Sequence, residues 1–160
     1  MDENQTKKST RKQTRTIFEV AVGLLARREH SEMELARKLM QRKYSQSEID
    51  EVLEKVKSCN YLDDERFVDA FVTSRKNRGQ GPLKIKAQLQ QRGVASSLIG
   101  RFVHDRDECW LDMAAEVYQK KFGTTAPEDY AAKVKAWRFM QSRGFTQDQF
   151  EHASHADLLE

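Results

Sequence analysis

A run of basic side chains in the middle of the sequence is the clearest candidate for binding chemistry. No acidic residue occurs between Asp69 and Asp105, although exposed helices usually carry charges of both signs. The candidate basic surface comprises Arg75, Lys76, Arg78, Lys84, Lys86 and Arg92. Such cations attract phosphates, and arginine also binds carboxylates through paired hydrogen bonds. We therefore predict a contact surface for a protein partner or for single- or double-stranded DNA, with Arg75 and Arg78 as its first candidates. A merely solvated surface is the alternative.

No set of residues in the sequence predicts catalysis. The glycines do not form the GxxxxGK pattern of a nucleotide-binding loop, and no Ser, Cys or His lies in a recognisable nucleophile motif. Asp148, His152 and His155 could share one helix face, but a zinc site usually has four ligands and no fourth ligand is evident. We therefore expect a binding protein that is not an enzyme and that uses neither a metal nor a cofactor.

The segment Tyr61-Leu62-Asp63-Asp64 is predicted to have a structural role. Tyr61 and Leu62 would pack at a junction between helical units. The two aspartates would cap the helix that follows, because negative charge is favourable at the start of a helix. A role of the two acids in partner binding is the alternative.

The elements that position these residues come from an internal repeat of about fifty residues. The segment Leu39–Ser45 recurs as Leu89–Ala95 and again as Met140–Thr146. The matching position holds Lys43, Gly93 or Gly144. We expect it to form a left-handed turn between the second and third helices of each copy, a conformation that glycine adopts without strain. The apolar residue after each turn should fold back onto the core.

Each copy of the repeat is predicted to contain three helices, because apolar residues with helical periodicity alternate with helix start and stop signals. Capping boxes open the helices of the first copy. Gly81 and Pro82 place a proline in the first turn of a helix in the second copy, and Pro127 is expected to open a long helix in the third. We predict an all-α protein without strands, in which three tandem three-helix, helix-turn-helix-like repeats form an elongated, curved array.

The expected organisation is a disordered basic tail over 1–15, followed by repeats over 16–62, 63–106 and 107–160. Lys and Arg outnumber Asp and Glu over residues 1–62 and over 63–106, whereas 107–160 is acidic and the whole chain has a net charge of +3. This asymmetry favours an anionic partner for the front of the molecule. The chain lacks a signal sequence and an apolar run long enough to cross a membrane. We therefore expect a cytoplasmic monomer without membrane contact.

Several segments resemble the RecX family of RecA regulators. They are Asn60–Val68, Ser74–Ile85, Leu89–Val94, Arg27–Leu39 and Lys133–Phe145. The resemblance covers residues 16–150 and implies a regulator that binds RecA filaments on DNA, in the helical groove of the filament. It also implies inhibition of strand exchange, ATP hydrolysis and co-protease activity, and thus a role in recombination, DNA repair and the SOS response. A helix-turn-helix protein that acts directly on DNA is the alternative, because the same basic residues and turns would serve it.

Overall fold

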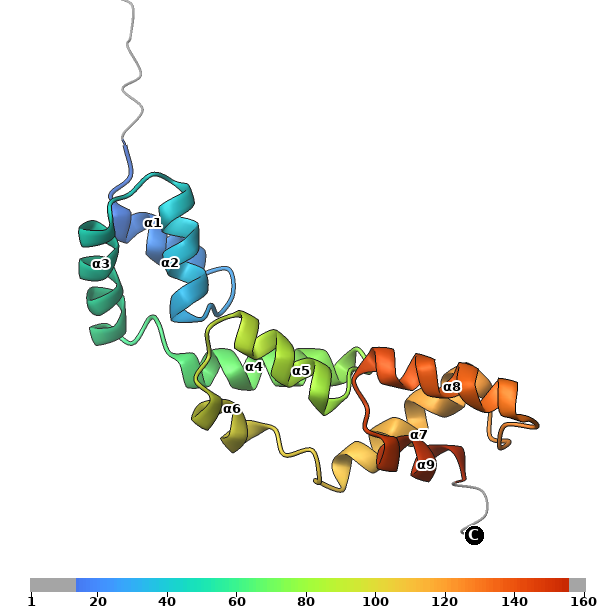
Figure 1. The fold of residues 1–160 in the computed structure, drawn as a ribbon. Helices are drawn as coiled ribbons and strands as arrows, with labels where there is room; N and C mark the ends of the chain where they lie inside the picture. The colour runs from blue at the N-terminus through green and yellow to red at the C-terminus, as the bar shows by residue number, and fades with distance from the viewer. Residues whose placement is uncertain (1–13, 156–160) are drawn as a thin grey trace, which may run out of the picture.

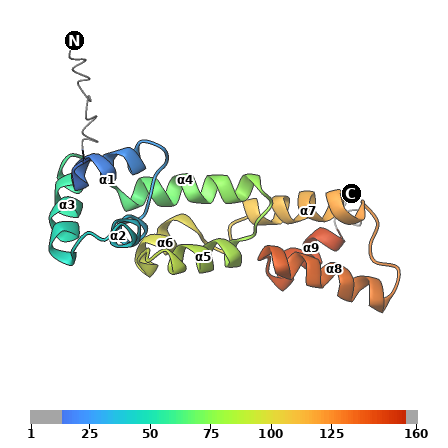
Figure 2. The same ribbon diagram turned by 90° about the horizontal axis from the view of Figure 1, so that it is seen from above.

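A computed structural model describes residues 14–155, which contain nine α-helices and no β-strand. The helices are α1 (Ile17–Leu25), α2 (Glu32–Gln41), α3 (Gln46–Ser58), α4 (Asp64–Asn77), α5 (Pro82–Gln91), α6 (Ser96–Phe102), α7 (Cys109–Phe122), α8 (Tyr130–Arg143) and α9 (Gln147–Ser154). Three successive units, α1–α3, α4–α6 and α7–α9, form an elongated body that bends after the first unit (Figures 1 and 2). The predicted fold is therefore confirmed. The expected basic tail lies, except for its last two residues, outside the described residues.

The predicted start signals open most of the helices. Thr16, Ser31 and Ser45 each accept a hydrogen bond from the amide three residues later, and the Glu at that position bonds back to the cap amide. Thr146 opens α9 with the same box, and Pro82 occupies the first position of α5. Each box satisfies amides that have no partner within the helix.

The start of α8 differs from the prediction. Asp129, not Pro127, marks this start, because its side chain accepts a hydrogen bond from the amide of Ala132 at 2.7 Å. Pro127 therefore lies in the preceding loop. An aspartate in the extended conformation is a strong helix cap, and here it outweighs the preference of proline for a first helical turn.

Each unit buries its own hydrophobic cluster. Leu35 and Ile49 are fully buried in the first unit, Leu89 in the second, and Met140 and Phe145 in the third. The apolar residues that follow the three turns contact these clusters, as predicted. In the described part of the chain, no helix has the length and apolar character that a membrane crossing requires.

The predicted left-handed turns are present in all three units. The backbone angle φ is 70° at Lys43, 75° at Gly93 and 93° at Gly144. Each turn ends the second helix of its unit and directs the chain into the third.

These turns also join the units to one another. The turn of the second unit lies on the start of α2, where the hydroxyl of Ser31 donates to the carbonyl of Arg92 at 2.7 Å. The turn of the third unit lies on the start of α5 in the same way: the amide of Gly81 donates to the carbonyl of Arg143 at 2.7 Å. In both cases a carbonyl at the end of one helix accepts a hydrogen bond from a donor at the start of another helix. Each bond satisfies a terminal carbonyl that has no partner within its own helix.

The Tyr61–Asp64 segment forms the junction between the first two units, with two departures from the prediction. Asp63 caps α4 by accepting from the amides of Glu65 and Arg66, as predicted. Asp64 instead accepts from the amide of Glu32 at 2.9 Å and so ties α4 to the start of α2.

The second departure concerns Tyr61, which is 48% exposed, whereas Leu62 is buried. The left-handed Asn60 follows the C-cap of α3, and of the two residues after it only Leu62 belongs to the buried cluster of the first unit. Tyr61 lies against Phe18 of the first unit, with ring centroids 6.4 Å apart.

Candidate partner-binding site

The structure divides the six cations of the candidate basic surface into two groups. The lysines are engaged near the third unit: Lys86 pairs with Asp105, Lys84 donates to the carbonyl of Ser142 at 3.0 Å, and Lys76 lies 4.5 Å from the ring centre of Trp110. The three arginines, Arg75, Arg78 and Arg92, lie together at the junction between the first and second units.

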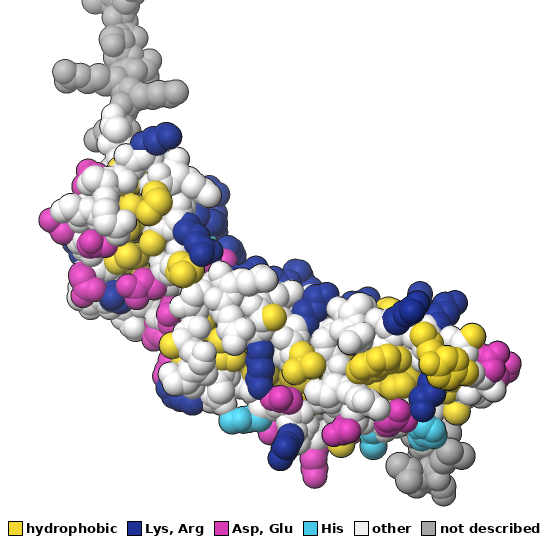
Figure 3. Space-filling model, viewed as in Figure 1, with side chains coloured by type: hydrophobic (Ala, Val, Ile, Leu, Met, Phe, Trp, Pro, Cys, Tyr) yellow, Lys and Arg dark blue, Asp and Glu magenta, His cyan; other side chains and the backbone are white. Residues whose placement is uncertain are grey.

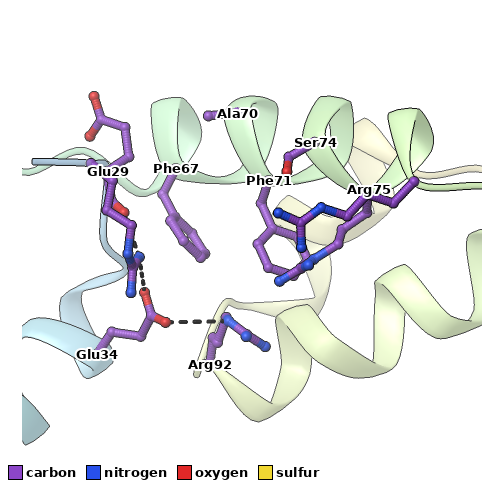
Figure 4. A pocket seen from close by; sticks show the side chains of 10 residues that line it. Glu29, Glu34, Phe67, Ala70, Phe71, Ser74, Arg75 and Arg92 are labelled. Carbon is purple, nitrogen blue, oxygen red and sulfur yellow. Dashed lines mark hydrogen bonds and ion pairs between the residues drawn. The ribbon is translucent and has the colours of Figure 1, made fainter. Parts of the chain in front are cut away.

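These arginines line a cavity of about 340 Å³, which we call the first pocket (Figure 4). Its apolar side is formed by Phe67, Ala70 and Phe71 of α4. Its opposite side comes from the first unit and contains Arg28, Glu29 and Glu34. The pocket therefore combines an apolar surface with charges of both signs.

Phe71 holds two of the arginines in place. The guanidinium carbons of Arg75 and Arg92 lie 4.6 Å and 4.7 Å from the centre of its ring. Cation–π contacts of this kind restrict the side chains before a ligand arrives, so less conformational entropy is lost on binding.

Positive charge in the first pocket is only partly neutralised. Glu34 pairs with both Arg28, at 3.2 Å, and Arg92, at 3.3 Å. Burial raises the pKa of Glu34, but the hydrogen bond and charge of Arg28 bring it below its ordinary value, so the carboxylate stays ionised. Within residues 14–155, Arg75 and Arg78 have no carboxylate at ion-pair distance. These two guanidinium groups are the available cations of the site.

Arg75 also carries a buried donor without an acceptor. Its Nε atom has no hydrogen-bond partner within the described chain. Burial lowers the pKa of Arg75, and the charges of Arg78 and Arg92 lower it further, but a guanidinium remains protonated at neutral pH. An oxyanion that entered the pocket would relieve the repulsion among the arginines.

Three contributors to this site were not predicted from the sequence: Arg28, Glu34 and Phe71. Glu34 and Arg28 come from the first unit, and only the docking of the two units brings them to α4. One sequence signal was available, because Arg28 and Arg78 are separated by the repeat length.

His30 is buried beside the wall of the first pocket, only 1% exposed. Its Nδ1 lies 3.0 Å from the carbonyl oxygen of Arg28, and its Nε2 lies 3.0 Å from Nζ of Lys38. A neutral ring that donates from Nδ1 and accepts at Nε2 satisfies both contacts. Burial lowers the pKa of His30, and the charge of Arg28 lowers it further.

The free energy of unfolding is therefore expected to fall as the solution is acidified below about pH 6.5, the ordinary pKa of histidine. The unfolded chain takes up this proton near that pH, whereas the folded chain takes it up only at lower pH. Gln80 stands at the position of the second repeat that matches His30 of the first. The His30→Gln variant should therefore fold, and its free energy of unfolding should lack this part of the pH dependence. Urea denaturation of both proteins at pH 8 and pH 5.5 measures it. Parallel losses of stability in the two proteins would assign the pH dependence to other groups.

Comparisons with known proteins extend over all three units. Family models for the first, second and third three-helix domains of RecX match residues 18–55, 63–101 and 107–153. The regulatory protein RecX of Halorhodospira halophila is 41% identical over 140 residues, which are 88% of this chain and 87% of that protein. RecX of Actinobacillus pleuropneumoniae is 38% identical over 144 residues, covering 89% and 93%. The crystal structure of RecX from Lactobacillus salivarius superposes with a TM-score of 0.73 at 17% identity, over 90% of this chain and 96% of that one.

Proposed function

Because the chain belongs to the RecX family of regulatory proteins, we propose that it binds RecA filaments on DNA and inhibits their recombinase, ATPase and co-protease activities. Its role would then be to modulate recombination, DNA repair and the SOS response. The observation that carries the proposal is the match of all three RecX domains, in order, to the three units of the fold. An effect on ATP hydrolysis would be exerted on the partner, since the sequence has no nucleotide-binding loop.

The shape of the molecule supports binding to a filament. Three units in series present several contact points along one elongated body (Figure 2). When weak contacts are linked in one chain, the second forms at a high effective concentration after the first. A filament that repeats the same subunit would therefore bind this body better than a single subunit does.

Direct action on DNA through a helix-turn-helix motif is the second candidate, favoured by the basic residues and the turn before the third helix of each unit. In such motifs the helix after the turn enters the major groove. Here that helix carries exposed acids in the first unit: Glu48, Asp50, Glu51 and Glu54. DNA phosphates would repel this surface, so the filament is the better supported partner.

Reversal of the two available cations tests the proposal. Arg75→Glu combined with Arg78→Glu is expected to weaken inhibition of the DNA-dependent ATPase and of strand exchange by RecA by roughly tenfold or more, because two favourable charges become repulsive. Added salt should weaken inhibition by the wild-type protein in the same direction. Circular dichroism checks that the helices are retained.

The matched control is Lys43→Glu combined with Arg106→Glu, which changes the net charge equally at two exposed residues outside the first pocket. It should inhibit RecA nearly as well as the wild type. Equal losses in both double variants would mean that only overall charge matters. A wild-type protein that leaves RecA activity unchanged would reject the proposed function itself.

A further inference from the structure

A second cavity lies at the junction between the second and third units. It has a volume of about 380 Å³, and we call it the second pocket. Its charged lining consists of Arg78, Lys120, Lys121 and Arg143, and Phe139 forms part of its wall. No carboxylate lines this pocket, so its positive charge is less compensated than that of the first pocket.

The two pockets are built from matching positions of the repeat. Ser31 and Gly81 both cap the second helix of their units. Arg28 and Arg78 each lie three residues before that cap, and each contributes to the pocket at the junction that follows its unit. Each pocket therefore receives one arginine from the loop of the preceding unit.

The following unit supplies the other matching cations. Arg92 and Arg143 each directly precede the left-handed glycine of their unit. Arg75 and Lys121 each come from the last turn of the first helix of their unit. Two repeat-related positions, together with one cation from the last turn of the first helix, thus contribute to each pocket.

In both pockets two of these cations lie over one aromatic ring. Lys121 and Arg143 lie 5.7 Å and 5.3 Å from the centre of the Phe139 ring, much as Arg75 and Arg92 lie on Phe71. The cations cover the ring faces, so these rings are not platforms for stacked nucleobases. The ligand must instead be recognised by its negative charge.

The two pockets are neighbours, because Arg78 lines both. Figure 3 shows many of the Lys and Arg side chains along the inner edge of the bend, and most visible Asp and Glu side chains along the outer edge. A partner that approached the inner edge would therefore meet many positive and few negative side chains.

We infer that the two pockets bind carboxylate side chains of an acidic protein surface, one at each junction. The inference rests on the proposed function, because it names the chemistry by which the filament would be held. One feature of the pockets favours carboxylate side chains over DNA phosphates. Each pocket has an apolar wall against which the methylene groups of an acidic side chain can pack, whereas a phosphate belongs to a continuous sugar backbone. The planar guanidinium of Arg75 offers paired donors, which fit a carboxylate as well as they fit a phosphate.

The test uses the full chain and no RecA. An acetylated oligoglutamate peptide and an oligothymidine of equal charge are titrated separately into the protein, and the Nε–Hε resonances of arginine are followed by NMR. The peptide is expected to shift the signals of Arg75 and Arg143, and oligothymidine should bind at least several-fold more weakly. Equal or tighter binding of oligothymidine at the same resonances would overturn the inference in favour of DNA. Unchanged Arg75 and Arg143 signals would overturn it altogether.

Variants separate the two pockets. Arg75→Gln and Lys121→Gln should each weaken peptide binding roughly threefold, as expected for the loss of one partly exposed ion pair, and together roughly tenfold. Arg106→Gln, an exposed cation that lines neither pocket, is the control and should have no effect. If the control weakens binding as much as the pocket variants do, the attraction is nonspecific and the pockets are not the sites. A failure to inhibit RecA is a separate result, because the peptide assay contains no RecA.

Discussion

Gly144→Ala is expected to lower the free energy of unfolding by about 3 kcal/mol or more, although it adds only one methyl group. The left-handed φ of 93° is unfavourable for any residue with a side chain. A Cβ atom here would also lie 2.3 Å from Cβ and 2.5 Å from the backbone nitrogen of Lys84. Because α5 holds that nitrogen in place, relief of the clash requires the second and third units to separate. Chemical denaturation followed by circular dichroism measures the loss.

The matching turns provide a graded control for this prediction. At Gly93 the three atoms nearest to an added Cβ all belong to the side chain of Met33 and none to a backbone, and Met33 is 39% exposed, so Gly93→Ala should cost less than Gly144→Ala. Lys43→Ala keeps a side chain at a turn on which no unit docks, and should change stability by less than about 0.5 kcal/mol. Equal losses for Gly93→Ala and Gly144→Ala would show that backbone strain alone, and not the docking of units, requires glycine.

This gradation explains why the repeat has lysine in one copy and glycine in two. Within residues 14–155 no unit precedes that of Lys43, whereas the turns at Gly93 and Gly144 each lie against the start of the second helix of the preceding unit. A lysine can adopt a positive φ at some energetic cost, but its side chain does not fit where the backbone of another helix lies close to the turn. The sequence alone predicted the left-handed turns and left the reason for this difference undetermined.

Local signals made most of the fold predictable. Residues close in sequence determine the capping boxes, the proline in α5 and the left-handed turns. The order of residue types along the chain was therefore sufficient to predict where these features lie. The start of α8 was missed where two local signals, Pro127 and Asp129, competed. The packing of the units required distances that sequence patterns do not contain.

The candidate site was less predictable, because its charge balance is set by contacts between units. The stretch without acids suggested one basic surface, yet Asp105 and Glu34 lie outside that stretch and pair with Lys86 and Arg92. Within the described residues, the cations that have no carboxylate partner are the smaller group around Arg75. Repeat-related arginines could be aligned from sequence, but only the docked units show that they face one cavity.

Trp110→Ala is expected to lower the free energy of unfolding by about 3 to 5 kcal/mol. Trp110 belongs to α7 of the third unit, yet it is 1% exposed within the hydrophobic cluster of the second unit. Its Nε1 donates to the carbonyl of His104 at 2.8 Å. Truncation would leave a cavity and an unpaired carbonyl, and would remove an anchor between the two units. Tyr130→Ala, at a residue that is 83% exposed, is the control and should change stability by less than about 0.5 kcal/mol.

The same substitution should weaken the coupling between the second and third units. Trp137 is then the sole remaining tryptophan, and its fluorescence reports on the third unit, whereas circular dichroism reports on all helices. Trp110→Phe is the single-tryptophan reference, because it keeps most of the packing. Relative to it, Trp110→Ala should increase the difference between the unfolding midpoint measured by Trp137 fluorescence and the midpoint measured by circular dichroism, because the hydrophobic cluster of the second unit loses the side chain that α7 inserts into it. Coincident transitions with an unchanged midpoint would mean that Trp110 does not couple the second and third units and that other contacts between them do.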